Sequence, residues 1–190
     1  MRDTRAFVAY NEKDDEIVVA FRGTNGADYE NWITNINGWR VPYKVLANVY
    51  VHKGFSDAYN DISEELLTAI SNQKSLHKSA SIIVTGHSLG GALATLCAID
   101  VREILKFPLE KVTFYSFGSP RVGNDKFADY VMELFEGGNY KRVTHYTDMV
   151  VHCPPPMIGF KHSGNEVWYK NENYDSVFIE CPNEPLVRES

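Results

Sequence analysis

The fold of this chain is decided by one stretch, residues 82–95, which reads IIVTGHSLGGALAT. Its first four residues are a β-branched run without polar alternation, which is typical of a strand buried on both faces. From Leu89 the chain is rich in alanine and leucine, which predicts a helix to about Lys106, just before Phe107 and Pro108. The strand therefore turns into the helix within a few residues, and Ser88 lies at this turn.

Ser88 is the central residue of the pentapeptide GHSLG, residues 86–90. On a tight strand-to-helix turn a serine hydroxyl projects above the sheet, and glycines at both ends avoid collisions with the neighbouring strand and helix. The backbone N–H of Leu89, at the helix N-terminus, can then face a developing oxyanion. Such a pentapeptide also arises by chance as an ordinary turn, but its place between strand and helix favours a nucleophilic serine.

A carboxylate is expected after the serine. A serine hydroxyl becomes a nucleophile only when a histidine base takes its proton, and an acid orients that base. In a scaffold of this kind the chain order is serine, acid, histidine. Asp148 comes just after the predicted strand 143–146, and parallel strands bring their C-terminal ends to the edge where ligands bind. Asp148 is therefore predicted as the acid, with a structural turn carboxylate as the alternative.

Strands and helices alternate along the rest of the chain. The runs 6–10 and 17–22 predict a hairpin across a polar turn, and a helix capped by Ser56 or Asp57 follows to about Gln73. The remaining predicted elements are the strand 112–117, the helix 125–134, the strand 141–146 and two C-terminal strands, 166–170 and 176–181. We predict one α/β-hydrolase domain over residues 1–190, with a mostly parallel central sheet, helices on both faces and antiparallel hairpin edges.

Composition excludes several classes of protein. The net charge of −6 and the scattered basic residues argue against a nucleic-acid surface. No stretch approaches the roughly 20 apolar residues of a membrane span. Residues 1–5 are polar and are not followed by an apolar signal-peptide region, so we expect either a cytosolic protein or a leader upstream. Metal-ligand spacings are absent, and no cofactor is expected.

The three cysteines differ in their surroundings. Cys97 lies in the apolar helical stretch and is expected to be a small buried side chain. Cys153 and Cys181 could pair with each other or with a cysteine not present here.

Several ordered motifs resemble the fungal-type triacylglycerol lipases, the class 3 lipases. These motifs are AFRGT (20–24), NWI (31–33), VHKGF (51–55), TGHSLGGALAT (85–95), YSFGSPRVGN (115–124), RVTHYTDMVV (142–151), GFKHS (159–163) and EVWY (166–169). The resemblance implies a secreted serine ester hydrolase that acts on lipid esters at a lipid–water interface. It also implies that Thr24 supplies an oxyanion-hole donor opposite Leu89, and that residues 29–37 form a lid.

The predicted lid has an apolar face. Trp32, Ile33 and Ile36 would gather on one side of a short helix, cover the serine in water and turn outward onto lipid, with Asn25 and Gly26 as a hinge. The alternative is a helix packed permanently on the core.

The sequence motifs do not identify the histidine that would act as the base for Ser88. The resemblance places the catalytic histidine in a loop after the last strand, but the last of the six histidines in this sequence is His162. Both ends also look short beside the family. Three explanations stay open: the chain is a fragment of a secreted lipase, it is a lipase-like protein that has lost its base and works by binding, or His162, failing that His152, has taken over the role.

These observations favour a triacylglycerol lipase that acts through an acyl-enzyme on Ser88, with Asp148 as the triad acid. Another enzyme on the same scaffold, a feruloyl or phospholipid esterase, is the first alternative. A catalytically dead interaction domain is the second.

Overall fold

The computed structural model describes residues 4–24, 36, 38–44, 46–173 and 177–181. One sheet runs through it in the order β1-β2-β5-β6-β7-β8-β9, and β3 and β4 form a small separate pair. The strands are β1 (Ala6–Asn11), β2 (Glu16–Phe21), β3 (Arg40–Pro42), β4 (Tyr50–His52), β5 (Ser81–His87), β6 (Val112–Phe117), β7 (Asn139–His145), β8 (Glu166–Tyr169) and β9 (Phe178–Cys181). The helices are α2 (Lys53–Leu76), α3 (Leu89–Glu103) and α4 (Asp125–Leu134), with the 3-10 turns η1 (Leu109–Lys111), η2 (Val150–His152) and η3 (Pro156–Ile158).

The centre of the large sheet is parallel and its two edges are antiparallel. Strands β2, β5, β6, β7 and β8 pair in parallel, whereas β1 pairs with β2 and β8 with β9 in the antiparallel sense. The connections between the parallel strands β5, β6 and β7 pass through α3 and α4, as parallel pairing requires a crossover. The predicted fold class is confirmed by this topology.

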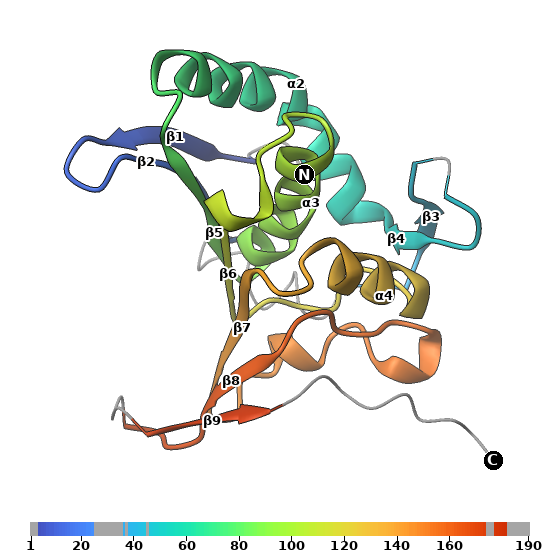
Figure 1. The fold of residues 1–190 in the computed structure, drawn as a ribbon. Coiled ribbons are helices and arrows are strands. Elements are labelled where there is room, and N and C mark those ends of the chain that lie inside the picture. The colour runs from blue at the N-terminus through green and yellow to red at the C-terminus, as the bar shows by residue number, and fades with distance from the viewer. Residues whose placement is uncertain (1–3, 25–35, 37, 45, 174–176, 182–190) are drawn as a thin grey trace.

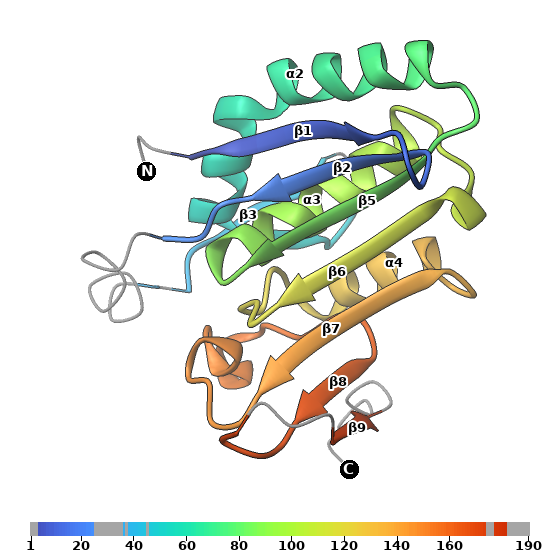
Figure 2. The ribbon, with the colours of Figure 1, turned by 90° about the vertical axis from the view of Figure 1, so that its left-hand side faces the viewer.

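The helices of the described residues all pack on one face of this sheet (Figures 1 and 2). Strand residues that point toward them, such as Ile82, Val84 and Phe114, are fully buried. On the opposite face Ile83 and Val143 are only half-buried, and Phe117 is 42% exposed. The predicted helices on both faces are thus seen, in the described part of the chain, on one face only.

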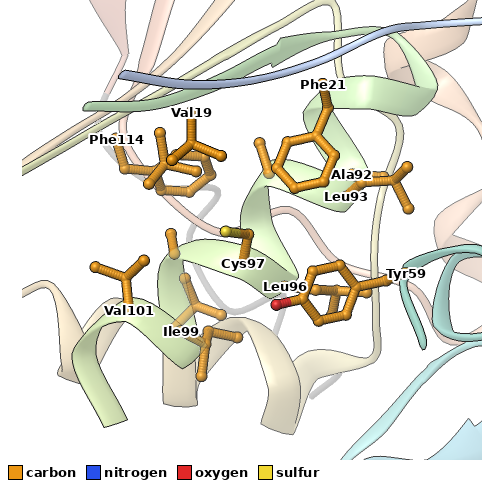
Figure 3. Close-up of a cluster of buried hydrophobic side chains, with 14 of the residues drawn as sticks. Val19, Phe21, Tyr59, Ala92, Leu93, Leu96, Cys97, Ile99, Val101 and Phe114 are labelled. Atoms are coloured by element: carbon orange, nitrogen blue, oxygen red, sulfur yellow. The ribbon is translucent and has the colours of Figure 1, made fainter. Parts of the chain in front are cut away.

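Helix α3 is the centre of the core (Figure 3). Residues 89–101 are all buried because the helix lies between the sheet and α2. Leu93 and Leu96 are large side chains that fill the core, while the glycines and alanines of α3 let the helix approach the strands. Cys97 is fully buried there, as predicted, and burial raises the pKa of its thiol.

The elements differ from prediction mainly at their ends. Helix α2 begins at Lys53, earlier than the predicted caps Ser56 and Asp57, because β4 leads into it directly at His52. Helix α3 ends at Glu103 instead of about Lys106, which takes a left-handed backbone with φ of 54°. The β3–β4 pair was not predicted.

Candidate active site

The turn at Ser88 joins β5 to α3 in a strained backbone conformation. Ser88 has φ of 56° and ψ of −125°, in a region that side chains other than glycine rarely occupy. A Cβ at position 86 would come within 2.2 Å of the Gly90 carbonyl oxygen, and one at position 90 within 2.4 Å of the Phe21 carbonyl oxygen. Both glycines are therefore required by backbone approach, as the sequence predicted.

The Ser88 hydroxyl is buried. Ser88 is 1% exposed, and its Oγ has no hydrogen-bond partner among the described residues. Leu89, the first residue of α3, is 7% exposed and carries one of the backbone N–H groups that a helix N-terminus leaves without an intrahelical acceptor. The turn thus presents a hydroxyl and a nearby N–H group in a site shielded from water.

The chain after β2 passes close to this turn. A Cβ at Gly23 would lie 2.8 Å from the His87 carbonyl oxygen and 3.6 Å from Ser88 Cβ. Thr24 follows directly, and its Oγ1 is a buried atom without a partner in the described part of the structure. The predicted oxyanion residue is therefore next in sequence to a glycine that contacts the serine turn.

Asp148 lies in the turn that follows β7, two strands along the sheet from β5. Its Oδ1 accepts a hydrogen bond from the Val150 N–H at 2.9 Å, and its own N–H donates to the His145 carbonyl at 3.1 Å. Its Oδ2 is close to Gly118, since a Cβ there would come within 2.7 Å of it. The carboxylate is therefore held through one oxygen, and the other faces the glycine at the end of β6.

Two buried side chains, Arg121 and His162, hold the backbone that follows Asp148. The guanidinium of Arg121 donates to the His152 carbonyl at 2.7 Å and to the Pro154 carbonyl at 3.2 Å. His162 Nε2 lies 2.7 Å from the Val151 carbonyl oxygen, and since a carbonyl only accepts, this nitrogen carries a proton. Arg121 is 5% and His162 8% exposed. Both side chains fix the backbone that immediately follows Asp148.

A cavity of about 730 Å³ opens beside Asp148 at the C-terminal ends of β5, β6 and β7. Its lining comprises His87, Phe117, Gly118, Val143, Thr144, His145, Tyr146, Thr147, Asp148 and Tyr169. Sequence reasoning missed Gly118 as a site residue, although a glycine at the end of the strand beside the serine turn is a usable signal. His87, the residue before Ser88, is exposed and lines this cavity as well.

All six histidines lie in the described part of the chain, and no hydrogen bond joins any of their rings to Ser88 Oγ or to the Asp148 carboxylate. His52 packs on the Phe55 ring, and His77 stacks on Tyr10. His162, the candidate base named from the sequence, is directed to the Val151 carbonyl instead. The histidine ring described beside Asp148 is that of His87, whose Nε2 lies 3.2 Å from the position that a Cβ of Gly118 would take, while Asp148 Oδ2 lies 2.7 Å from the same position.

The structure also bears on the predicted lid and the cysteines. Trp32 and Ile33 of the predicted lid lie outside the described residues, while Ile36 is half-buried and packs against the core. Cys153 and Cys181 are both free thiols. Among the described residues there is no group of three or more potential metal ligands, and none of their helices is long and apolar enough to cross a membrane.

A mostly parallel sheet with a strained serine turn leading into a buried helix defines the chain as an α/β-hydrolase. Residues 18–157 match the family model described as lipase (class 3), and the chain belongs to this family. The sequence-based recognition is confirmed.

Several lipases are similar to this chain in sequence or structure. A secreted mono- and diacylglycerol lipase of Fusarium solani is 40% identical over 163 residues, 86% of this chain and 46% of the relative. The solved Rhizomucor miehei triacylglyceride lipase is 36% identical with a TM-score of 0.84, over 89% of this chain and 63% of that one. A triacylglycerol lipase whose catalytic centre is a serine protease triad is 38% identical with a TM-score of 0.82, over 87% and 62%. The chain spans about half the length of the curated relatives it matches.

Proposed function

We propose that this chain is a serine ester hydrolase that cleaves acylglycerols through an acyl-enzyme on Ser88. The observation that carries the proposal is the buried hydroxyl of Ser88, which has no hydrogen-bond partner among the described residues and stands at a backbone φ of 56° at the start of α3. Such strain is maintained at functional sites because the surrounding structure over-determines it. Asp148 is the triad acid in this proposal, with its Oδ1 fixed by the Val150 N–H.

The oxyanion is assigned to two donors. The Leu89 N–H lies at the N-terminus of α3, where the helix dipole favours negative charge. Thr24, next to Gly23, supplies its N–H from the other side, together with its hydroxyl, which has no partner in the described part of the chain. Loss of one such donor costs on the order of 100-fold or more in turnover.

The substrate class follows from the relatives, which are named as lipases acting on mono-, di- and triacylglycerol. We extend this specificity to the present chain, with Trp32, Ile33 and Ile36 as the lid at a lipid–water interface. A feruloyl or phospholipid esterase would use the same serine turn, so the substrate decides between them.

The test is labelling by a fluorophosphonate probe together with hydrolysis of a glycerol ester, a phospholipid and a feruloyl ester. Ser88→Ala should abolish labelling, whereas Ser116→Ala, an equally buried serine at 1% exposed, should keep it. Preference for the glycerol ester supports the lipase assignment. Labelling that survives Ser88→Ala would contradict the proposal, and complete inertness of the folded chain under all conditions would favour the interaction domain.

A further inference from the structure

The connection between β7 and β8 carries an apolar loop at residues 155–159, which reads PPMIG and is exposed at every residue. At its centre is the turn η3, where Met157 is 89% and Ile158 41% exposed. The residues on either side are held in the protein, since Pro154 is buried and Phe160 is 2% exposed. This tip loop therefore projects from the surface and carries only apolar side chains and a glycine.

The tip loop has a fixed shape. Two prolines restrict the backbone of its first half, and Arg40 Nη1 donates to the Gly159 carbonyl at 3.1 Å at its end. A Cβ at Gly38 would lie 2.4 Å from Ile158 Cδ1, so the chain leading into β3 runs against the loop. A partner would thus meet a preformed surface, which lowers the entropy cost of binding.

The tip loop lies at the edge of the sheet that carries the site. Lys161, just after the loop, bridges to Gly123 in the connection that follows β6, and Asp148 stands earlier in the same β7–β8 connection. Figure 2 shows this connection, in orange, beside the arrowhead ends of β6 and β7. Ser88 follows the C-terminal end of β5, which is the neighbour of β6. The tip loop and the nucleophile therefore lie at the same edge.

The chemistry of the tip loop fits a neutral lipid surface. Residues 153–160 include no charged side chain, and the net charge of −6 opposes attraction to an anionic surface. A projecting apolar tip offers no polar side chain that could orient a protein partner. The acyl chains of a lipid layer are fluid, so they accept an apolar side chain of any shape and gain from its removal from water.

We propose that the tip loop docks on a neutral lipid surface, with Met157 inserted among the acyl chains, and holds the Ser88 edge of the protein against that surface. The inference rests on the proposed function, because the ester substrate would be met at such a surface. It assigns this anchoring to a fixed loop of the fold and not to the predicted lid. Hydrolysis of dispersed lipid should then depend on the tip loop, whereas hydrolysis of a dissolved ester should not.

The first experiment measures co-sedimentation with phosphatidylcholine vesicles, in a Ser88→Ala background that leaves the lipid intact. Met157→Asp should lower the partition coefficient by roughly tenfold or more, because a charged group does not enter the apolar layer. Leu76→Asp is the matched control and should leave it unchanged, since Leu76 is 74% exposed at the end of α2, shortly before β5 begins at the opposite edge of the sheet. Equal partition coefficients for the two variants, or no binding by the background chain, would overturn the inference.

The second experiment tests insertion directly, by tryptophan fluorescence with brominated phosphatidylcholine. Met157→Trp should be quenched beyond the wild-type chain with its three native tryptophans, and Leu76→Trp should not. Equal quenching of the two variants contradicts insertion of the tip loop. A dimer in analytical ultracentrifugation that Met157→Asp dissociates, without vesicle binding, would assign the loop to a second copy of the chain and reject the lipid surface.

The docking proposal and the esterase proposal fail in different ways. With Ser88 intact, Met157→Asp should keep fluorophosphonate labelling and the hydrolysis of dissolved 4-nitrophenyl butyrate, and should lose most of the hydrolysis of emulsified glycerol tributyrate. Equal rates on the emulsion for Met157→Asp and wild type would overturn the docking role. Vesicle binding by a chain that the probe does not label at Ser88 rejects the esterase and leaves the docking loop standing, whereas labelling without vesicle binding does the reverse.

Discussion

Protonation of His162 should destabilise the protein below neutral pH. Its ring is 8% exposed and donates to the Val151 carbonyl, and burial together with the charges of Arg142 and Arg121 holds its pKa well below the ordinary value of 6.5. The unfolded chain takes up a proton near pH 6.5 while the folded chain does not, so the free energy of unfolding falls as pH falls. One such group costs about 1.4 kcal/mol per pH unit, which amounts to roughly 2 kcal/mol at about pH 5.

The measurement is urea unfolding of the wild-type chain and of His162→Gln at several pH values between about 5 and 8. Glutamine keeps a donor for the Val151 carbonyl and does not titrate. The wild-type chain should lose more stability than the variant as the pH falls, and the difference between them should grow by about 1.4 kcal/mol per unit below pH 6.5. Parallel pH profiles for the two chains would refute the assignment of a neutral, buried His162.

Two further substitutions test the packing around the site. Gly90→Ala should lower the free energy of unfolding by about 1–3 kcal/mol, because its Cβ would meet the Phe21 carbonyl oxygen at 2.4 Å. Urea unfolding checks this, and an unchanged free energy of unfolding in Gly90→Ala contradicts it. Glu166→Leu should cost about 3–5 kcal/mol, because Arg142, 5% exposed, donates to Glu166 Oε1 at 3.0 Å and would be left as a buried charge. Thermal unfolding measures this loss, and a double variant with Arg142→Met should recover part of it; an unchanged midpoint in the single variant would refute the pairing.

The serine turn was predictable because its causes are local. A β-branched run, two glycines and an alanine-rich helix follow one another within residues 82–95, and the close approach at Gly86 is to Gly90 of the same turn. The close approach at Gly90 is to Phe21 of β2, so this one contact comes from the tertiary structure. The strand 112–117 and the helix 125–134 were likewise predicted with the bounds that the structure gives. Asn124 shows the same local origin, since its side chain accepts the Phe127 N–H and begins α4.

Contacts between distant segments were not predictable. The β3–β4 pair joins two three-residue strands that carry little pattern of their own. His162 could be named as a candidate base, but only the fold shows its ring on a carbonyl 11 residues earlier. Asp148, Gly118 and His87 come together from three strand ends far apart in the chain.

The sequence by itself determined the serine turn, the parallel sheet and the lipase family, because hydrophobic pattern and glycine placement act over short distances along the chain. Only the tertiary structure decided where the histidine rings point and which groups border Asp148 Oδ2. The reason is that side-chain direction at a strand end depends on register and on neighbouring strands, which no local pattern encodes. Ser88 therefore follows from residues 82–95, whereas the cavity beside Asp148 follows from the assembly of β5, β6 and β7.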